Sequence, residues 1–362
     1  MKKVNHTNKL ASLLFAVLIG LWCLSASPAQ GAENGGKVDV KEIVLGHMGD
    51  AYEWSITSWN GHHLSIPLPV IVKSEVNGWQ FFSSARFHDN ASGTYQGFYL
   101  NQKANGKVYE LLPNGNSVRP LDFSITKDVV QIWIVVAILA IVFLSAARWY
   151  KGRKAGDAAP KGMVGVIEMF VTSLNDDLIR PSVGEKHYRQ YAPYLLTAFF
   201  FIFTANLLGL LPIFPGGANV TGNINITLFL ALCTMLLINL FGNKAYWKDI
   251  FWPEVPVWLK VPIPIMPVIE LFGIFTKPFA LMVRLFANMM AGHAIILSLT
   301  CVIFITCQMG ALIGGSLTFV SFIMMIFMNA LELIVAFIQA YVFTMLSAVF
   351  IGLAHPEHKE AA

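Results

Sequence analysis

Long apolar runs dominate the chain from residue 129 onward. Three of these runs have the length of one helical crossing of a membrane: Val129–Ala147, Tyr191–Leu211 and Ile224–Phe241. A helix needs about 20 predominantly apolar residues to cross the roughly 30 Å hydrocarbon core of a bilayer. The pattern therefore predicts three transmembrane helices in this part of the chain.

Two further apolar runs, residues 262–306 and 315–353, are too long for an ordinary span. About 40 helical residues extend on the order of 60 Å at 1.5 Å per residue, twice the thickness of the hydrocarbon core. Each run must either break into a hairpin or cross the membrane obliquely. Neither run has a turn at its middle that is both charged and rich in Pro and Gly. We therefore expect two long, steeply tilted helices and about five spans in all.

The segments outside these runs have other patterns. Residues 164–180 (VGVIEMFVTSLNDDLIR) mix apolar and polar side chains at helical spacing, which predicts an amphipathic helix in the membrane interface. Residues 32–127 are polar and aromatic, with short alternating runs and Asn-Gly turns that predict strands. The predicted fold class is an all-α polytopic membrane protein with an interfacial helix and a small β-containing N-terminal element.

Positive charges predict the orientation of the chain. Five basic residues follow the first span: Arg148, Lys151, Arg153, Lys154 and Lys161. Lys and Arg concentrate in cytoplasmic loops, so this end of the span is expected to be cytoplasmic and residues 32–127 extracytoplasmic. Residues 128–358 then form the transmembrane domain, and residues 359–362 are a cytoplasmic tail.

Residues 1–31 have the pattern of a cleavable secretory signal. Lys2, Lys3 and Lys9 precede the apolar stretch Leu10–Leu24, and the small residues of SASPAQGA follow it. The alternative is a short membrane anchor, but the apolar stretch is shorter than a span requires. We therefore expect export of residues 32–127 followed by cleavage.

Composition excludes a soluble enzyme. Hydrophobic residues make up 56% of the chain and charged residues 13%, with a mean hydropathy of +0.60, whereas soluble domains carry about 25% charged residues. The sequence contains no GxxxxGK[ST] nucleotide-binding loop. The net charge of +4 is modest and predicts no nucleic-acid partner. The four cysteines show no metal-ligand pairing, and the histidines of HMGDAYEW and NGHHLS are expected to be solvated or packed rather than metal ligands.

A set of polar side chains interrupts the two longest apolar runs. Arg284 lies near the middle of the first, where a charge costs about 2.5–3.5 kcal/mol on insertion scales. At 100° per residue, Glu270, Lys277 and Asn288 fall in one stripe with Arg284, whereas His293 faces the opposite side. In the last run Glu332 and Gln339 are seven residues apart and share a face.

The chemistry of these residues favours proton transport. Arginine stays protonated in proteins, so it can fix a positive potential but cannot relay a proton. Carboxylates and histidine titrate, and their surroundings tune their pKa values. A permanent cation between titratable groups therefore predicts a barrier between two proton routes, which attracts a carboxylate from another subunit.

Structural roles are the alternatives for the same residues. Lys277 has the position of a side chain that snorkels to the interface. Asn288 and Gln339 are of the type that hydrogen-bonds between helices. Arg284 would form a structural ion pair with Glu270 or Glu332 if its role were packing alone.

Several motifs resemble subunit a of the F-type ATP synthase. They include TKP at 276–278, RLFANMMAGH at 284–293 and LELIVAFIQAYVF at 331–343. MVGVIEMFVTSLN, ANLLGLLP and NINITLFLAL extend the likeness over most of residues 128–358. The resemblance implies a stator subunit of the membrane Fo sector in a bacterial inner membrane, with no catalytic residue, nucleotide, cofactor or metal of its own. It also implies a c-ring, the b subunits of a peripheral stalk and lipid as partners.

The resemblance also implies a role for each polar residue. Arg284 matches the family's essential arginine, which interacts with the c-ring carboxylate and prevents a proton short-circuit, with Asn288 and Gln339 beside it. Glu270 matches the acidic residue of the cytoplasmic half-channel. His293 and Glu332 match the titratable pair of the outer half-channel.

Two positions depart from the family pattern. Histidine and acid stand exchanged at 293 and 332 relative to some bacterial members, and the exchange supports contact between the two side chains. Ala287 replaces a common glycine. We expect H⁺ rather than Na⁺ as the coupling ion, because His293 and Glu332 titrate and no dense cluster of oxygen ligands is visible.

Two other functions remain as alternatives. One is a secondary transporter in which Arg284 binds a substrate carboxylate, although the inverted repeats common in such folds are not visible. The other is a structural assembly subunit.

Overall fold

The structure of the chain is a computed structural model. It describes residues 48–355 except 60–61, 75–76, 89–92, 102–105, 113–114, 154–158, 212–215, 253–264 and 307–310. The expected signal segment (1–31) and the cytoplasmic tail (359–362) lie outside the described residues.

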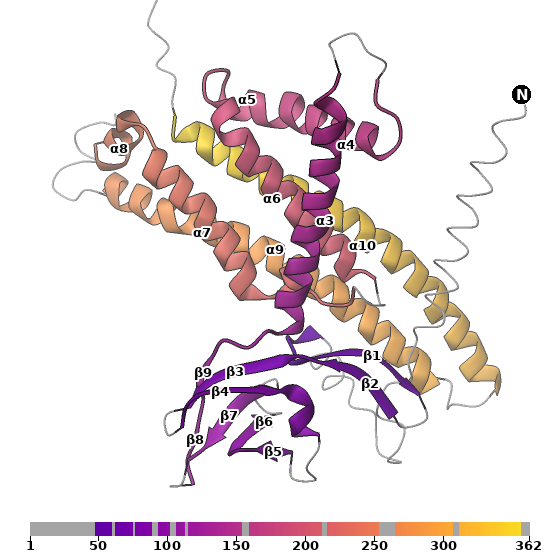
Figure 1. The fold of residues 1–362 in the computed structure, drawn as a ribbon. Helices are drawn as coiled ribbons and strands as arrows, with labels where there is room; N and C mark the ends of the chain where they lie inside the picture. Colours follow the sequence, from indigo (N-terminus) through magenta and orange to yellow (C-terminus); the bar gives the residue numbers. More distant parts are fainter. Residues whose placement is uncertain are drawn as a thin grey trace, which may run out of the picture. The chain divides into compact units, whose positions relative to one another are not determined.

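Five helices have the length and apolarity of membrane spans, which confirms the predicted fold class. Figure 1 shows them as α3 (Lys127–Tyr150), α6 (Tyr188–Gly209), α7 (Ile224–Phe241), α9 (Ile265–Thr306) and α10 (Ala311–Leu353). Their bounds lie within a few residues of those expected from hydropathy, because a span is fixed by the thickness of the hydrocarbon core.

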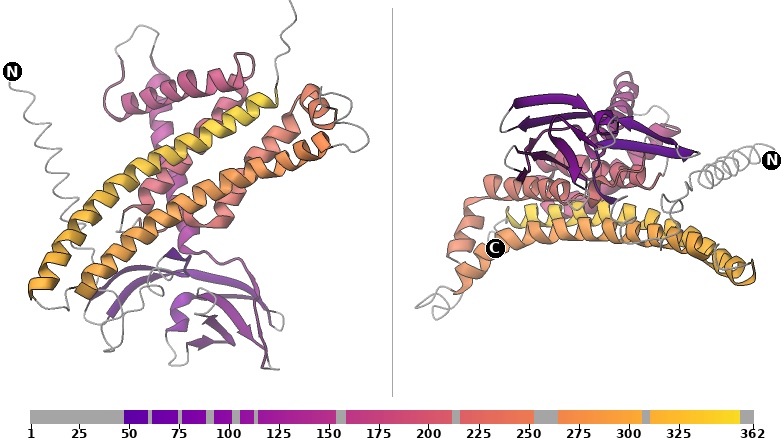
Figure 2. Two further views of the ribbon diagram at one scale, coloured as in Figure 1. Left: turned by 180° about the vertical axis from the view of Figure 1, so that it is seen from behind. Right: turned by 90° about the horizontal axis from the view of Figure 1, so that it is seen from below.

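The last two spans are continuous helices and not hairpins. α9 contains 42 residues and α10 contains 43, and Figure 2 shows both without a break. Pro278 lies inside α9 without ending it. At 1.5 Å per residue each helix is about 63 Å long, so a steep tilt remains the prediction for keeping both within a bilayer.

The amphipathic helix occurs where it was predicted. It consists of α4 (Met163–Ser173), a π-helical turn η3 (Leu174–Ile179) and α5 (Arg180–Val183), which follow one another directly. Leu174, Leu178 and Val183 are buried, whereas Asp176 and Asp177 are exposed. In its first part the apolar Met163, Val166 and Met169 are exposed as well. A second short amphipathic helix, α8 (Lys244–Phe251), follows α7.

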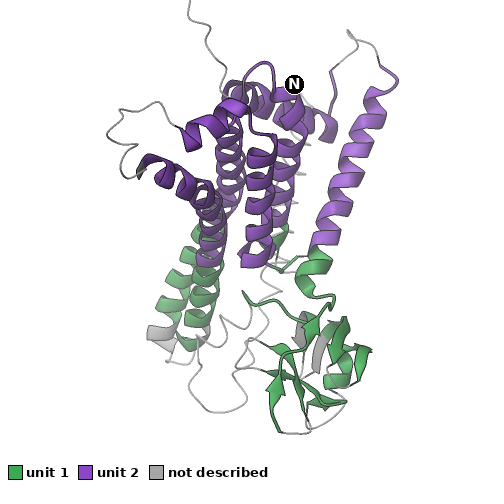
Figure 3. Ribbon diagram, turned by 90° about the vertical axis from the view of Figure 1, so that its left-hand side faces the viewer, with its two compact units in different colours: residues 1–131, 208–218, 293–330 green, residues 132–207, 219–292, 331–362 purple. Residues whose placement is uncertain are grey.

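The chain divides into two compact units, which Figure 3 colours separately. Unit 1 comprises residues 1–131, 208–218 and 293–330, and unit 2 comprises residues 132–207, 219–292 and 331–362.

The core of unit 2 lies between its helices. Phe199, Leu195 and Ile202 of α6 pack in one cluster with Leu285 of α9 and Phe343 of α10. Polar contacts join the same helices: the Tyr194 hydroxyl lies 2.7 Å from that of Thr234, which is 3.4 Å from the Ser347 hydroxyl. Helices in a membrane associate through close packing and such interhelical hydrogen bonds.

The N-terminal element of unit 1 is built from three antiparallel sheets. One pairs β1 (Glu53–Trp59) with β2 (His62–Pro67). The second has the order β4-β3-β9, from Gly78–Ser83, Pro69–Ser74 and Leu121–Asp122. The third has the order β5-β6-β7-β8, from Thr94–Tyr95, Phe98–Asn101, Lys107–Leu111 and Ser117–Val118.

Its core contains Tyr52, Val70, Val72, Phe98 and Val108. Three Asn-Gly pairs place their glycines, Gly78, Gly106 and Gly115, at positive φ. Glycine adopts that conformation without steric cost, which is why these dipeptides predict turns.

The substitution Gly352→Ala tests the contact between α10 and α5 of the amphipathic helix. A Cβ at this position would lie 2.0 Å from the backbone oxygen of Ser182. We expect Gly352→Ala to destabilise the protein by about 1–3 kcal/mol through overpacking, measured by denaturant unfolding in detergent. Gly315→Ala is the matched control in the same helix, since nothing lies within 4 Å of its Cβ position. Equal stabilities of the two variants would contradict the close approach.

Candidate functional site

Arg284 projects from an exposed face of α9. Ala280, Ala287 and Asn288 lie on that face within about 60° of Arg284 and are also exposed. Within the described ranges, Arg284 forms no ion pair and no hydrogen bond. The ion pair with Glu270 or Glu332 that a purely structural role would require is therefore absent from the described part of the chain.

The two polar residues expected beside Arg284 differ in exposure. Asn288 lies one turn along the same exposed face, whereas Gln339 of α10 is buried with 7% of its surface exposed. Neither side chain forms a hydrogen bond among the described residues. Within this part of the chain, neither side chain therefore forms the interhelical hydrogen bond that a purely structural role would require.

Glu332 is buried on α10 and packs against α9. A Cβ added at Gly292 would lie 3.0 Å from Oε1 of Glu332, and only 5% of Glu332 is exposed. The glycine therefore leaves room for a carboxyl group between the two helices. Sequence reasoning missed this role, although a glycine inside a helix costs about 1 kcal/mol and usually has a packing reason.

A buried polar bridge fixes α6 against α10 one turn from Glu332. The Asn206 side chain donates a hydrogen bond to the backbone oxygen of Ala336 at 3.3 Å. Its Oδ1 accepts a 2.6 Å hydrogen bond from the Thr221 hydroxyl. Both side chains are almost completely buried. Asn206 is visible in the sequence as a polar residue inside a span, but its partners are not.

His293 lies half-buried in unit 1. Its Nε2 atom is 3.4 Å from the backbone oxygen of Gly209, and a Cβ at Gly209 would come within 3.8 Å of the same nitrogen. The proximity of His293 to Glu332 stays a prediction.

Glu270 and Lys277 occupy the first turns of α9. Burial raises the pKa of the Tyr246 hydroxyl in α8, and the charge of Glu270 adds to this effect. The same hydroxyl donates a hydrogen bond to Oδ1 of Asn239 at 3.3 Å. Lys277 places its Nζ 5.8 Å from the ring centroid of Phe350. Its ammonium group therefore meets an aromatic ring of α10, a favourable cation–π geometry.

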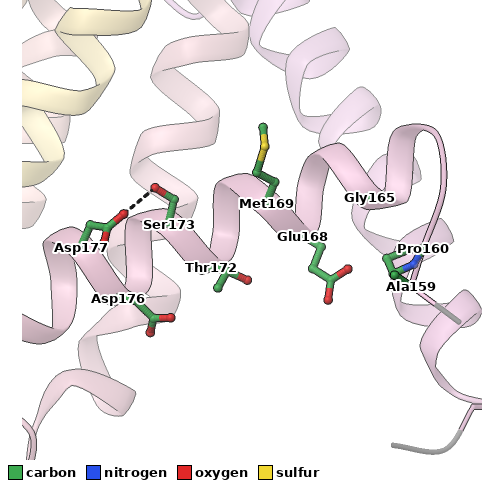
Figure 4. Close-up of a pocket in the computed structure, with 9 residues that line it drawn as sticks. All are labelled: Ala159, Pro160, Gly165, Glu168, Met169, Thr172, Ser173, Asp176 and Asp177. Atoms are coloured by element: carbon green, nitrogen blue, oxygen red, sulfur yellow. Dashed lines mark hydrogen bonds between the residues drawn. The ribbon is translucent and has the colours of Figure 1, made fainter. Parts of the chain in front are cut away.

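An open depression of about 560 Å³ lies along the interfacial helix and contains none of these residues. Figure 4 shows the carboxylates of Glu168, Asp176 and Asp177 on its lining, with Asp177 accepting a hydrogen bond from Ser173. No group of three His, Cys, Asp or Glu side chains is arranged to hold a metal ion among the residues that the structure describes.

Known proteins resemble the chain in two separate parts. Residues 129–352 match the family described as ATP synthase A chain. Residues 43–123 match a family described as a domain of unknown function (DUF8433).

Individual relatives extend over most of the chain. ATP synthase subunit a 2 of Chlorobaculum tepidum is 46% identical over 243 residues, 66% of this chain and 65% of that one. ATP synthase subunit a of Chlorobium phaeobacteroides is 43% identical over 266 residues, 70% and 74% of the two chains. ATP synthase subunit a of an Anaeromyxobacter species is 34% identical over 346 residues, 92% of this chain and 75% of that one. The alignment thus covers just under two thirds of the first relative and about three quarters of the other two.

Thr221→Val tests the hydrogen bond that Thr221 donates to Asn206 of the buried polar bridge. The substitution keeps the shape of the side chain but removes the donor to Asn206, so we expect a loss of about 0.6–1.7 kcal/mol in unfolding free energy. Denaturant unfolding in bicelles measures it. Thr197→Val is the control, because the Thr197 hydroxyl is exposed and bonds only to the Pro193 oxygen of its own helix. A loss no larger than that of the control would show that the hydrogen bond from Thr221 to Asn206 contributes nothing.

Proposed function

This chain belongs to the ATP synthase A chain family, and we propose that within the Fo sector it carries protons to and from the carboxylates of a c-ring. In this proposal two half-channels, one from each side of the membrane, meet the ring on either side of Arg284. Proton flow through them turns the ring and drives ATP synthesis, which other subunits catalyse.

The exposed, partnerless guanidinium of Arg284 carries the proposal. An ionised group in a span is strongly disfavoured unless it is paired or reaches water. The described part of the chain supplies no anion to Arg284, so we infer that its partner is a carboxylate of a neighbouring c subunit. A nearby cation favours the ionised form of a carboxyl group, so Arg284 would drive the proton off each arriving carboxylate without carrying it.

Titratable groups on both sides of Arg284 support two separate routes. Along a continuous helix, Glu270 lies about 21 Å before Arg284, and His293 lies about 14 Å beyond it. We propose that Glu270 serves the cytoplasmic half-channel and that His293 and Glu332 serve the outer one. Asn288 and Gln339 would hydrogen-bond to groups of the ring beside Arg284.

The distribution of basic residues supports an orientation in a bacterial inner membrane. Arg148, Lys151 and Arg153 follow α3, and basic residues concentrate in cytoplasmic loops. We propose that residues 32–127 are extracytoplasmic after removal of a signal at 1–31, and that residues 359–362 are cytoplasmic. The c-ring and the b subunits of the peripheral stalk are the proposed partners.

Arg284→Ala separates this function from its alternatives. We expect ATP synthesis and ATP-driven proton pumping to be abolished in membrane vesicles that still contain the assembled complex, because the side chain makes no polar contact in the described chain that folding would need. Val283→Ala, at the adjacent exposed position of α9, should retain both activities. Survival of synthesis and pumping would refute the role of Arg284, loss of the complex would favour a structural role, and loss of solute uptake would favour a transporter.

Gly292→Ala tests the role of Glu332 without removing its carboxyl group. The added Cβ, 3.0 Å from Oε1, displaces the carboxyl group by a few tenths of an ångström. We expect proton pumping to fall roughly two- to tenfold, since a displacement of about 1 Å can cost about 100-fold in activity. Gly315→Ala in α10 is the control, because nothing lies within 4 Å of its Cβ position. Equal pumping in the two variants would argue against a proton route through Glu332.

A further inference from the structure

One face of the sheet β4-β3-β9 is covered with exposed apolar side chains. Phe81 is 71% exposed, Leu121 63%, Phe123 61% and Trp79 52%, and Ile71 lies among them. We call these five residues the aromatic face. The opposite side of the same sheet packs into the core through Val70 and Val72, which are fully buried.

The aromatic face is continuous across the strands. Ile71 pairs with Phe81 in the register of β3 and β4, and the backbone nitrogen of Phe123 donates to the oxygen of Ile71 at 2.8 Å. The rings of Trp79 and Phe123 lie 5.5 Å apart between centroids. A sheet with one face in the core normally presents polar side chains on the other. An apolar second face therefore indicates an apolar partner.

Hydrogen bonds fix this sheet to the start of the first span. Phe123 lies four residues before Lys127, the first residue of α3. The backbone nitrogens of Ile125 and Lys127 donate to the oxygens of Pro69 and Ala51 at 3.1 and 3.0 Å. Four residues reach at most about 14 Å even when fully extended. The aromatic face is therefore held close to the point where α3 enters the membrane.

The chemistry of this face matches a lipid interface. It combines a tryptophan and two phenylalanines with two aliphatic residues, and the exposed Lys73 pairs in register with Trp79 and Leu121. Asp122, between Leu121 and Phe123, points to the other side of the sheet, where it accepts a hydrogen bond from the buried Tyr52 hydroxyl. Tryptophan sits at headgroup level, and a lysine can keep its charge in water while its stem lies on the apolar surface.

We propose that the aromatic face rests on the bilayer surface and makes the N-terminal element a peripheral lipid anchor beside the first span. Lipid is the favoured partner of this face because the short connection to α3 keeps the face within reach of the bilayer. The proposal requires only that α3 crosses the membrane, so it does not depend on the proposed proton pathway or on the side where the element lies.

Depth-dependent quenching in the assembled complex tests this anchor. The native cysteines are replaced, a single cysteine at Phe81 carries an NBD fluorophore, and the complex is reconstituted in vesicles whose lipids are spin-labelled near the headgroup. We expect the label at Phe81→Cys to lose most of its fluorescence. The same label at Leu111→Cys, which is 54% exposed on β7 of another sheet, should lose little.

If protein or water rather than lipid covers the aromatic face, the quenching results differ. A label at position 81 that is shielded from aqueous iodide but not quenched by the labelled lipid would mean that a second copy or another subunit covers the face. A label at position 81 that iodide quenches as strongly as the label at 111 would mean that the face is in water. Either result would overturn the proposal. Because Phe81 is largely exposed, its replacement is not expected to disturb folding, and an unchanged elution volume of the labelled complex in gel filtration verifies this.

Discussion

The hydrocarbon interior of a bilayer supplies no hydrogen-bond partner, and this constraint governs the arrangement of polar groups in the spans. Hydroxyls such as those of Thr300 and Thr344 bond to carbonyls of their own helices. The Asn206 side chain donates one hydrogen bond to Ala336 and accepts another from Thr221. Arg284 stands apart, because no hydrogen bond or ion pair of its own occurs among the described residues. An arginine left in that condition needs water or a partner beyond the described residues.

Close packing fixes how α9 and α10 contact their neighbours. Gly292 and Gly352 each lie where a single added carbon would meet Glu332 or the Ser182 backbone. Small residues such as Ala336, Ala340 and Ala348 are fully buried on α10. Close approach of helices is the main source of association energy in lipid, where no hydrophobic force acts between spans. The positions of polar side chains on these helices therefore follow from where small residues allow contact.

Much of this fold is readable from the sequence because the signals are local. Hydropathy gives the five spans, and the absence of a central turn gives continuous α9 and α10. The Asn-Gly pairs give three turns because the requirement for positive φ is a property of one residue. Helical periodicity also places Arg284 and Asn288 on one face, and both prove to be exposed.

What the sequence does not reveal depends on contacts between distant segments. The π-helical turn of Leu174–Ile179 has no signature in VGVIEMFVTSLNDDLIR, since an extra residue in a helical turn is accommodated by packing. The partners of Asn206 lie 15 and 130 residues away. The room that Gly292 leaves for Glu332 exists only once α9 and α10 are side by side. The apolar second face of the β4-β3-β9 sheet likewise depends on strand pairings that local alternation does not specify.

The exposure of Arg284 has a consequence for biogenesis. A subunit newly inserted into the membrane carries this charge before any rotor is present, in an environment that disfavours it by several kcal/mol. Under the proposed function, docking of the ring would relieve that penalty, so the free energy of assembly would include a contribution from the same side chain that acts in transport. An orphan subunit would then be less stable than an assembled one, which would give membrane proteases a physical basis for telling the two apart.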